Sequence, residues 1–327
     1  MTTKLLLVAL LLANATVGCA TEGPTAQITF KVTGENGALL AKVPIHVVLF
    51  DHQEPGAGFG NPIYKEITSL TDTQGIAVAR GSSLDNKVTY EVKDLSGYYN
   101  EGGPYSFKSS KDGRWEPWNP TVELVLRPIV NPVPMYARKV ETRISKSAQR
   151  YGYDLIVSDW VAPDGKGQTA DIFFELTGYA NNVKDYDSTL TVSFANPLDG
   201  IQPFVPIKGS SFRSPREAPL DGYQDKLELR RVRKPGQLSP AWIDDTQIDT
   251  NYIFRVRTVL DEYGKIKSAL YGKIYGSFKF YGASTNGSFL TIPACYLNPE
   301  PNSRNMEFDP KRNLFRKLDR FHEISLP

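Results

Sequence analysis

The sequence predicts an all-β protein of two β-sandwich domains with an extended C-terminal arm. Three observations lead to this prediction: tyrosine (17) and phenylalanine (16) are abundant, glycine (26) and proline (23) are frequent, and short alternations of apolar and polar residues recur. Aromatic side chains pack well on a pleated surface, and glycine and proline occupy turns. At 327 residues the chain is long enough for two domains with separate cores.

The overall composition excludes several classes of protein. Hydrophobic residues make up 40% and charged residues 23% of the chain, a balance that neither disordered nor membrane-embedded proteins show. The formal net charge of +2 gives no basis for nucleic-acid binding. We therefore expect a globular protein whose partners do not include nucleic acid.

The N-terminus has the pattern of an export signal. Lys4 precedes an apolar run over residues 5–13, which is too short to cross a bilayer but suits the hydrophobic region of a signal peptide. The run is followed by residues 16–19 (Thr-Val-Gly-Cys), which resemble a bacterial lipobox. Thr16 stands where that motif usually has an aliphatic residue. The pattern predicts export.

Two interpretations of this signal stay open. In the first, residues 1–18 are a signal peptide, Cys19 is lipidated, and residues 19–26 tether the protein in the periplasm or at the outer membrane. In the second, cleavage near Ala15 or Ala20 releases a secreted protein without a lipid. The spacing of the small residues favours lipidation.

The fate of the two cysteines depends on the same choice. If Cys19 is acylated, Cys295 is the remaining thiol in an oxidising compartment and is expected to be buried. If Cys19 is retained without a lipid, it can form a disulfide with Cys295. The apolar neighbours of Cys295 favour the buried thiol.

Residues 27–128 are expected to form the first β-sandwich. Residues 27–33 alternate apolar and polar side chains, as a half-buried strand does. Further strands, separated by turn residues, are predicted at 43–50, 64–70, 76–79, 87–92 and 122–126. Several short strands with turn signals between them are typical of a β-sandwich.

Four segments of this first domain carry a resemblance to a known family. They are residues 32–37 (VTGENG), 42–47 (KVPIHV), 71–75 (TDTQG) and 122–126 (VELVL). Gly37 and Gly75 fall where hairpin turns require a positive φ angle, and Asp72 can accept hydrogen bonds within its own turn. Together the segments resemble the carboxypeptidase regulatory-like domain, an immunoglobulin- or transthyretin-like β-sandwich. The sequence departs from the family pattern at Glu35 and in the additional residues before Pro44. Such domains are non-catalytic accessories, so the resemblance implies no active site here.

The rest of the chain is expected to contain a linker, a second domain and an arm. Residues 129–150 form a proline-rich linker, in which 139–150 suits a short helix or the lead-in to a strand. Residues 151–298 are predicted to form a second, jelly-roll-like β-sandwich. Its strands are expected at 154–161, 170–177, 189–194, 226–232, 252–260, 266–280 and 289–297. Residues 299–327 are polar and rich in proline and asparagine, which predicts an ordered surface arm with a basic tail.

The C-terminal part carries a second resemblance. Residues 252–258 (YIFRVRT), 272–278 (GKIYGSF), 296–299 (YLNP) and 305–315 resemble a group of exported proteins of environmental bacteria with no assigned function. The resemblance agrees with export and implies no ligand and no reaction.

The sequence lacks the motifs of common enzymes. No H-E-x-x-H, G-x-S-x-G, Walker or dinucleotide-binding motif occurs. His46 lies within a strand pattern and His52 follows it, a spacing that suits one metal ion poorly. Two loops contain clustered aspartates but too few oxygens for calcium, which prefers about six to eight. These aspartates are Asp185, Asp187, Asp244, Asp245 and Asp249. We therefore expect no metal, no cofactor and no catalytic residue.

A Gly/Pro/Ser-rich region over residues 96–120 contains the candidate ligand-binding residues. They are the aromatic residues Tyr98, Tyr99, Tyr105, Trp115 and Trp118. Exposed rings stack on sugars or anchor a partner protein. The alternative is that these rings cover the end of the first sandwich or dock it onto the second, because single surface aromatics are common.

Residues 230–234 (RRVRK) form the most basic segment of a predicted strand. On a strand, Arg231 and Arg233 share one face, and Arg230 and Lys234 share the other. One interpretation is a solvated edge strand whose charge prevents aggregation. The other is a contact with anionic lipid or lipopolysaccharide headgroups.

Three functional hypotheses follow from these patterns. The leading one is an exported, lipid-anchored, non-catalytic binding or structural protein of the bacterial cell envelope, whose partner is an envelope protein or a glycan. The second is a carbohydrate-binding module that uses the aromatic residues between 98 and 118. The third is a hydrolase with carboxylates dispersed over the second domain, which requires two facing carboxylates in a cleft.

Overall fold

A computed structural model describes residues 23–55, 60–238, 242–284 and 287–327. The expected signal peptide and Cys19 lie outside these ranges. Within them the regular structure consists of β-strands and two short 3-10 helices, η1 (Asp245–Gln247) and η2 (Pro310–Arg312). Among the described residues, no helix has the length and apolarity needed to span a membrane. The predicted all-β fold is confirmed.

The chain divides into two compact units. The first comprises residues up to 93 together with 102–125, and the second comprises 94–101 together with 126–327. Residues 94–101 therefore belong to the second unit, although they interrupt the sequence of the first.

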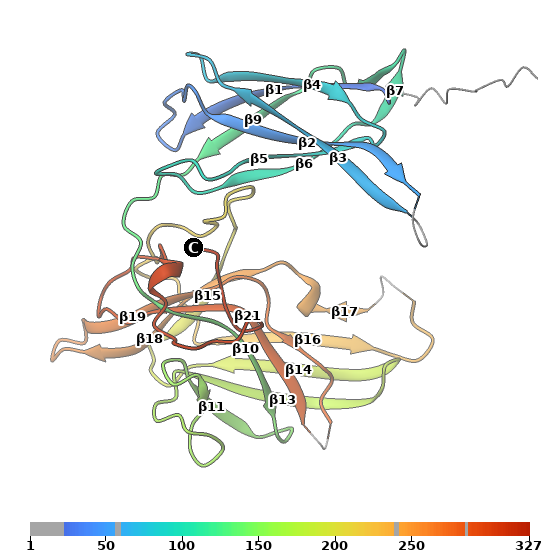
Figure 1. Cartoon of the computed structure of the whole chain (residues 1–327). Coiled ribbons are helices and arrows are strands. Elements are labelled where there is room, and N and C mark those ends of the chain that lie inside the picture. The colour runs from blue at the N-terminus through green and yellow to red at the C-terminus, as the bar shows by residue number, and fades with distance from the viewer. Residues whose placement is uncertain (1–22, 56–59, 239–241, 285–286) are drawn as a thin grey trace, which may run out of the picture. The chain divides into compact units, whose positions relative to one another are not determined.

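The first unit is a β-sandwich of two sheets (Figure 1). In its described part, one sheet has the strand order β4-β1-β8-β7, with β9 also paired to β1, and the other has the order β3-β2-β5-β6. The first sheet contains β1 (Thr25–Gly34), β4 (Ile76–Ser82), β7 (Ser109–Lys111), β8 (Arg114–Glu116) and β9 (Thr121–Leu126). The second contains β2 (Pro44–Glu54), β3 (Asn61–Leu70), β5 (Lys87–Val92) and β6 (Glu101–Ser106).

Alternating apolar residues build the core of this unit. Phe30 of β1 and Leu49 of β2 have almost no exposed surface, and their strand neighbours face outward. Each buried side chain of this size contributes about 1.5–3 kcal/mol. Gly37 and Gly75 adopt positive φ angles of 78° and 70°, and Asp72 accepts hydrogen bonds within its turn, as the sequence indicated.

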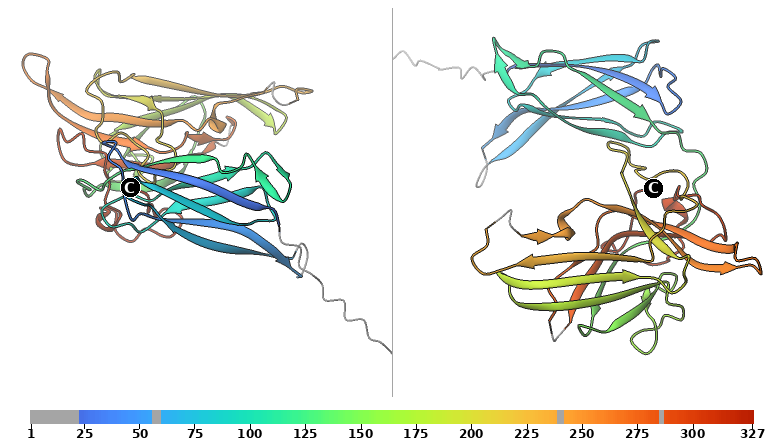
Figure 2. Two further views of the ribbon diagram at one scale, coloured as in Figure 1. Left: turned by 90° about the horizontal axis from the view of Figure 1, so that it is seen from above. Right: turned by 180° about the vertical axis from the view of Figure 1, so that it is seen from behind.

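The second unit is a larger β-sandwich. In its described part, two six-stranded sheets have the orders β10-β21-β19-β18-β15, with β20 paired to β21, and β12-β11-β13-β14-β16-β17 (Figures 1 and 2). The first sheet contains β10 (Tyr136–Ile144), β15 (Gly200–Phe204), β18 (Asn251–Leu260), β19 (Ile266–Ile274), β20 (Lys279–Phe280) and β21 (Ser288–Asn298). The second contains β11 (Arg150–Asp154), β12 (Asp159–Trp160), β13 (Ile172–Asn182), β14 (Asp185–Ser193), β16 (Lys226–Arg233) and β17 (Ile243–Asp244).

Aromatic residues fill the space between these two sheets. Phe174 of β13 and Phe254 of β18 are fully buried, and the ring of Phe174 meets that of Phe278 with centroids 5.9 Å apart. Cys295 of β21 belongs to the same core, as its apolar neighbours indicated, and burial raises the pKa of its thiol to about 12. The thiol is therefore protonated and unreactive at neutral pH.

Part of the expected linker is a strand. Within 129–150, residues 136–144 form β10, which pairs with β21 and buries Val140 and Ile144. Of the two alternatives for 139–150, the helix is therefore wrong, and residues 139–144 belong to a strand. A register shift between Arg138 and Val140 breaks the apolar alternation, and this irregularity hides the strand in the sequence.

The C-terminal arm packs on its own chain. Met306 and Phe308 are fully buried among residues of the second unit, and Ile324 is nearly so. Phe308 forms an isolated β-bridge with Val133. These apolar anchors fix an otherwise polar segment against the sandwich.

Candidate functional site

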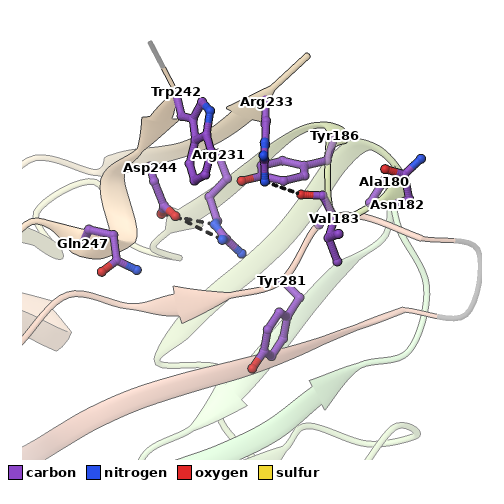
Figure 3. Close-up of a pocket in the computed structure, with 11 residues that line it drawn as sticks. Ala180, Asn182, Val183, Tyr186, Arg231, Arg233, Trp242, Asp244, Gln247 and Tyr281 are labelled. Carbon is purple, nitrogen blue, oxygen red and sulfur yellow. Dashed lines mark hydrogen bonds and ion pairs between the residues drawn. The ribbon is translucent and has the colours of Figure 1, made fainter. Parts of the chain in front are cut away.

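A pocket of about 860 Å³ opens in the second unit (Figure 3). Its wall is built from the β13–β14 hairpin, from β16, β17 and η1, and from the segment that follows β20. The lining residues are Ala180, Asn182, Val183, Tyr186, Arg231, Arg233, Trp242, Asp244, Gln247, Tyr281 and Gly282. Aromatic rings, guanidinium groups and amides therefore converge on one cavity, a composition typical of ligand sites.

Arg231 is held rigidly in the wall of this pocket. Its Nε and Nη2 donate to the two carboxylate oxygens of Asp244 at 3.1 and 3.0 Å, and its Nη1 donates to the carbonyl oxygen of Phe280 at 2.7 Å. The bidentate pair neutralises Arg231 and fixes its orientation. Because Phe280 lies in the other sheet, Arg231 also links the two sheets beside the pocket.

Arg233 lies on the same face of β16 and has a different environment. Its guanidinium carbon is 3.8 Å from the centroid of the Trp242 ring, a cation–π contact worth about 0.5–2 kcal/mol. Nη1 donates to the carbonyl oxygen of Val183 at 3.0 Å. The buried Nε has no hydrogen-bond partner among the described residues. An unsatisfied buried donor costs about 1–3 kcal/mol, and because this atom has no exposed surface a ligand cannot reach it in this conformation.

Gly282 allows the segment after β20, which forms part of the pocket wall, to lie close to the β13–β14 hairpin. A Cβ atom at Gly282 would lie 2.4 Å from the Cβ of Ala180, so only glycine permits this approach. The backbone N–H of Ala283 donates to Ser188 Oγ at 2.8 Å, and this hydroxyl donates to the carbonyl oxygen of Tyr179 at 3.0 Å. These bonds hold Tyr281, which is 67% exposed, at the rim of the pocket.

Two of the aromatic residues expected to bind a ligand belong to the second unit. Tyr98 is half-buried, and Tyr99 is buried. The Tyr99 hydroxyl donates to Glu307 Oε1 at 2.8 Å, and burial together with this carboxylate raises its pKa. Tyr99 is therefore a structural residue that attaches residues 94–101 to the C-terminal arm.

The other three belong to the first unit and are partly covered. Trp115 donates its indole N–H to the carbonyl oxygen of Ser83 at 2.9 Å. Trp118 has the guanidinium of Arg114 at 4.8 Å from its ring centroid, and Tyr105 packs edge-on against Phe107. Tyr105 and Trp115 both contact the ring of Phe107, with centroids 5.0 and 6.2 Å away, and among the described residues no ring contact joins Trp118 to them.

Most of the carboxylates and histidines named for metal binding have protein partners. Asp245 accepts the backbone N–H of Arg230 at 2.7 Å, and Asp187 lies 3.3 Å from Lys234 Nζ. His46 Nδ1 is 2.7 Å from Glu66 Oε1. Across the described ranges, no group of three or more His, Cys, Asp or Glu side chains is placed to hold a metal ion.

A second cluster of reactive side chains is closed to solvent. Lys273 Nζ donates to the carbonyl oxygen of Met306 at 2.7 Å, to Tyr275 Oη at 3.0 Å and to Ser214 Oγ at 3.3 Å. Burial lowers the pKa of Lys273. Lys273 and Ser214 have no exposed surface, so a substrate cannot reach them in this conformation. The cluster connects β19 with the C-terminal arm.

Glu101 provides a pH-dependent prediction for the second unit. Burial raises its pKa from 4.5 to about 7, against the opposing charge of Arg127. Because the native state then binds more protons than the unfolded state, stability falls as pH rises from about 4.5 towards 7. We expect Glu101→Gln to flatten this dependence, measured as the melting temperature between pH 5 and 8. The exposed Glu262→Gln is the control. Identical pH profiles for Glu101→Gln and wild type would contradict the prediction.

Comparison with known proteins adds little to this picture. No family model matches the sequence, and no curated protein matches it. Among solved structures, chlorocatechol 1,2-dioxygenase from Pseudomonas putida is similar at 16% identity and a TM-score of 0.25. The similarity covers 32% of this chain and 60% of that chain. It supports no inference about activity.

Proposed function

We propose that the protein is an exported, lipid-anchored and non-catalytic binding protein of the bacterial cell envelope, and that its pocket around Arg233 holds an anionic ligand. The observation that carries this proposal is the Arg233 guanidinium, which lies in the pocket lining beside the Trp242 ring and forms no ion pair with a described carboxylate. A carboxylate or similar anion would pair with this guanidinium while an apolar part of the ligand contacts the aromatic wall.

The charges of the pocket support an anion. Asp244 is the one carboxylate in the described lining, and it already forms a bidentate pair with Arg231. Arg233 contacts an aromatic ring and a carbonyl oxygen there, neither of which neutralises its charge. A ligand carboxylate would complete the charge balance of the pocket.

The same lining argues for binding rather than hydrolysis. Hydrolysis of a glycosidic bond by the common mechanisms uses two carboxylates that flank the bond. Asp244, held by Arg231, has no second carboxylate facing it in the described lining. The first unit, which resembles a regulatory-like domain, acts in this proposal as an accessory, and the lipid on Cys19 would keep the protein at the envelope.

The test uses galacturonate as the anionic probe and galactose as its neutral counterpart. Calorimetry on the mature protein should show binding of galacturonate and none of galactose. Arg233→Ala should weaken binding by about 10- to 100-fold, because a hydrogen bond to a charged group contributes about 1.5–3 kcal/mol. Arg230→Ala is the matched control, since Arg230 lies on the opposite face of the same strand. No binding of galacturonate, or equal losses in both variants, would contradict the proposal.

A further inference from the structure

The indole ring of Trp118 lies beside two arginines in the first unit. The guanidinium carbon of Arg114 is 4.8 Å from the centroid of this ring, and that of Arg80 is 5.8 Å from it. Both arginines are exposed, and the ring is half-buried. Neither guanidinium forms an ion pair with a carboxylate of the described residues. Two positive charges therefore lie beside one aromatic ring with no described carboxylate to neutralise them.

The position of this ring is fixed by the segment before β9. The Trp118 N–H donates to Glu116 Oε2 at 2.7 Å, and the Thr29 hydroxyl donates to Asn119 Oδ1 at 2.9 Å. The Thr29 N–H also donates to the carbonyl oxygen of Pro120 at 2.9 Å. Because Thr29 belongs to β1, these bonds hold the segment against the strand.

The register of the strands places both arginines on the outer face of their sheet. Arg80 of β4 pairs with Gln27 of β1, and Arg114 of β8 pairs with Thr25 of β1. Gln27 and Thr25 alternate with buried residues, so they and their partners face outward. Val78, two residues before Arg80, faces the same way and is 48% exposed. The ring, the two cations and this apolar side chain together form the Trp118 surface, made of Val78, Arg80, Arg114 and Trp118.

The Trp118 surface lies near the point where the chain enters the first unit. Thr25 is the first residue of β1 and comes six residues after Cys19. Six residues of fully extended chain span at most about 20 Å. A lipid on Cys19 would therefore hold Thr25, and with it the paired Arg114, within about 20 Å of the membrane surface.

We infer that the Trp118 surface contacts the anionic headgroups of the membrane in which Cys19 is anchored. The inference rests on the lipid anchor of the proposed function and gives the first unit a role of its own. Tryptophan suits the headgroup level because its ring is apolar and its N–H is polar, and arginines are attracted to an anionic membrane surface. The short tether and the exposed Val78 favour a membrane over a soluble anionic polymer.

The experiment measures co-sedimentation of the mature chain with lipid vesicles. Residues 20–327 are used without the lipid, because an acyl chain would itself insert into the vesicles. The chain should bind vesicles of phosphatidylglycerol and phosphatidylcholine in equal parts, and should not bind vesicles of phosphatidylcholine. Arg80→Gln and Arg114→Gln should each weaken this binding by about fivefold. Lys65→Gln is the matched control, because Lys65 is exposed on β3 in the other sheet of the same unit.

The outcomes separate this inference from the proposed function. No binding to the mixed vesicles, equal binding to both kinds of vesicle, or an equal loss in Lys65→Gln would overturn the inference. Stronger binding of polygalacturonate than of the mixed vesicles through the two arginines would assign the surface to a glycan and overturn it as well. Galacturonate binding by the second unit should be unchanged in Arg80→Gln and Arg114→Gln, so the anion pocket is tested separately. Circular dichroism of each variant checks that the fold is retained.

Discussion

Replacement of Glu307 by alanine is expected to lower the free energy of unfolding of the second unit by about 3–5 kcal/mol. Glu307 is 2% exposed, and its Oε1 accepts hydrogen bonds from the Tyr99 hydroxyl and the Val130 N–H, both at 2.8 Å. Its Oε2 accepts the Asn131 N–H at 2.7 Å. Alanine leaves the buried Tyr99 hydroxyl without its acceptor, which costs about 1–3 kcal/mol, whereas the two amides belong to exposed residues that water can reach. It also removes the ion-pair partner of Arg216, which lies 3.4 Å from Glu307 Oε1.

Hydrogen exchange measures this loss of stability at individual amides, so the second unit can be followed separately from the first. Peptides that contain Val130 and Asn131 should exchange faster in Glu307→Ala than in wild type, because the alanine removes the acceptor of both amides. Glu300→Ala provides the matched control, since Glu300 is exposed in the same arm. Protection equal to wild type at these amides would show that Glu307 does not hold the arm against the segment before β10.

Replacement of Arg257 by alanine is expected to destabilise the second unit by a similar amount, about 3–5 kcal/mol. Arg257 Nε donates to Asp171 Oδ1 at 2.6 Å, and its Nη2 donates to Asp171 Oδ2 at 3.0 Å and to Asp154 Oδ1 at 3.2 Å. The Asp171 and Asp154 side chains are 0% and 3% exposed. Without the guanidinium, two buried carboxylates face each other with no cation between them.

The loss in Arg257→Ala should depend on pH. Burial raises the pKa of Asp171 even beside Arg257, whereas backbone N–H donors outweigh burial at Asp154 and lower its pKa. Removing Arg257 raises the pKa of Asp171 further, so the native state binds more protons than the unfolded state and stability falls as pH rises. Urea unfolding should therefore show a larger difference from wild type at pH 8 than at pH 5.

Two further variants test the cause of this effect. Arg257→Lys keeps the charge but loses the bidentate geometry, so its stability should lie between those of wild type and Arg257→Ala. Arg320→Ala, at an exposed position, should leave stability within about 0.5 kcal/mol of wild type. A pH-independent loss in Arg257→Ala would show that packing of the arginine side chain, and not its charge, stabilises this site.

Local alternation in the sequence was sufficient to predict many strands. The segment 27–33 lies within β1, because inward and outward residues alternate without interruption. The segment 266–280 was expected as one strand but contains β19 and β20, because Gly276 adopts a φ angle of 88° and interrupts the extended backbone. A single glycine in an apolar run does not reveal whether the strand continues.

The candidate pocket was only partly predictable. The two-residue period of a strand placed Arg231 and Arg233 on one face, and both line the pocket. Trp242 and Tyr281 reach it through the pairing of β16 with β17 and of β20 with β21. Pairings between strands far apart in the sequence leave no local signal in it. The sequence alone therefore does not indicate that Trp242 and Tyr281 line the pocket.

The aromatic region between 98 and 118 shows the limit of composition as a guide to exposure. Its glycine, proline and serine content suggested rings in solvent, yet the residues that cover Tyr99 and Trp115 come from distant segments. Tyr99 contacts Phe212, with ring centroids 5.1 Å apart, and Trp115 bonds to Ser83. Polarity along the chain does not show which segments fold over it.

The pairing of β10 with β21 has a consequence for how the second unit folds. The first strand of this unit lies against its last, so the sheet gains this contact only when the whole segment is present. Closing so long a loop carries a large entropic cost, and a high contact order slows folding. During synthesis β10 therefore has no partner strand on this edge until β21 has been made. For a chain exported as proposed, this sheet would be completed only after β21 has also crossed the membrane.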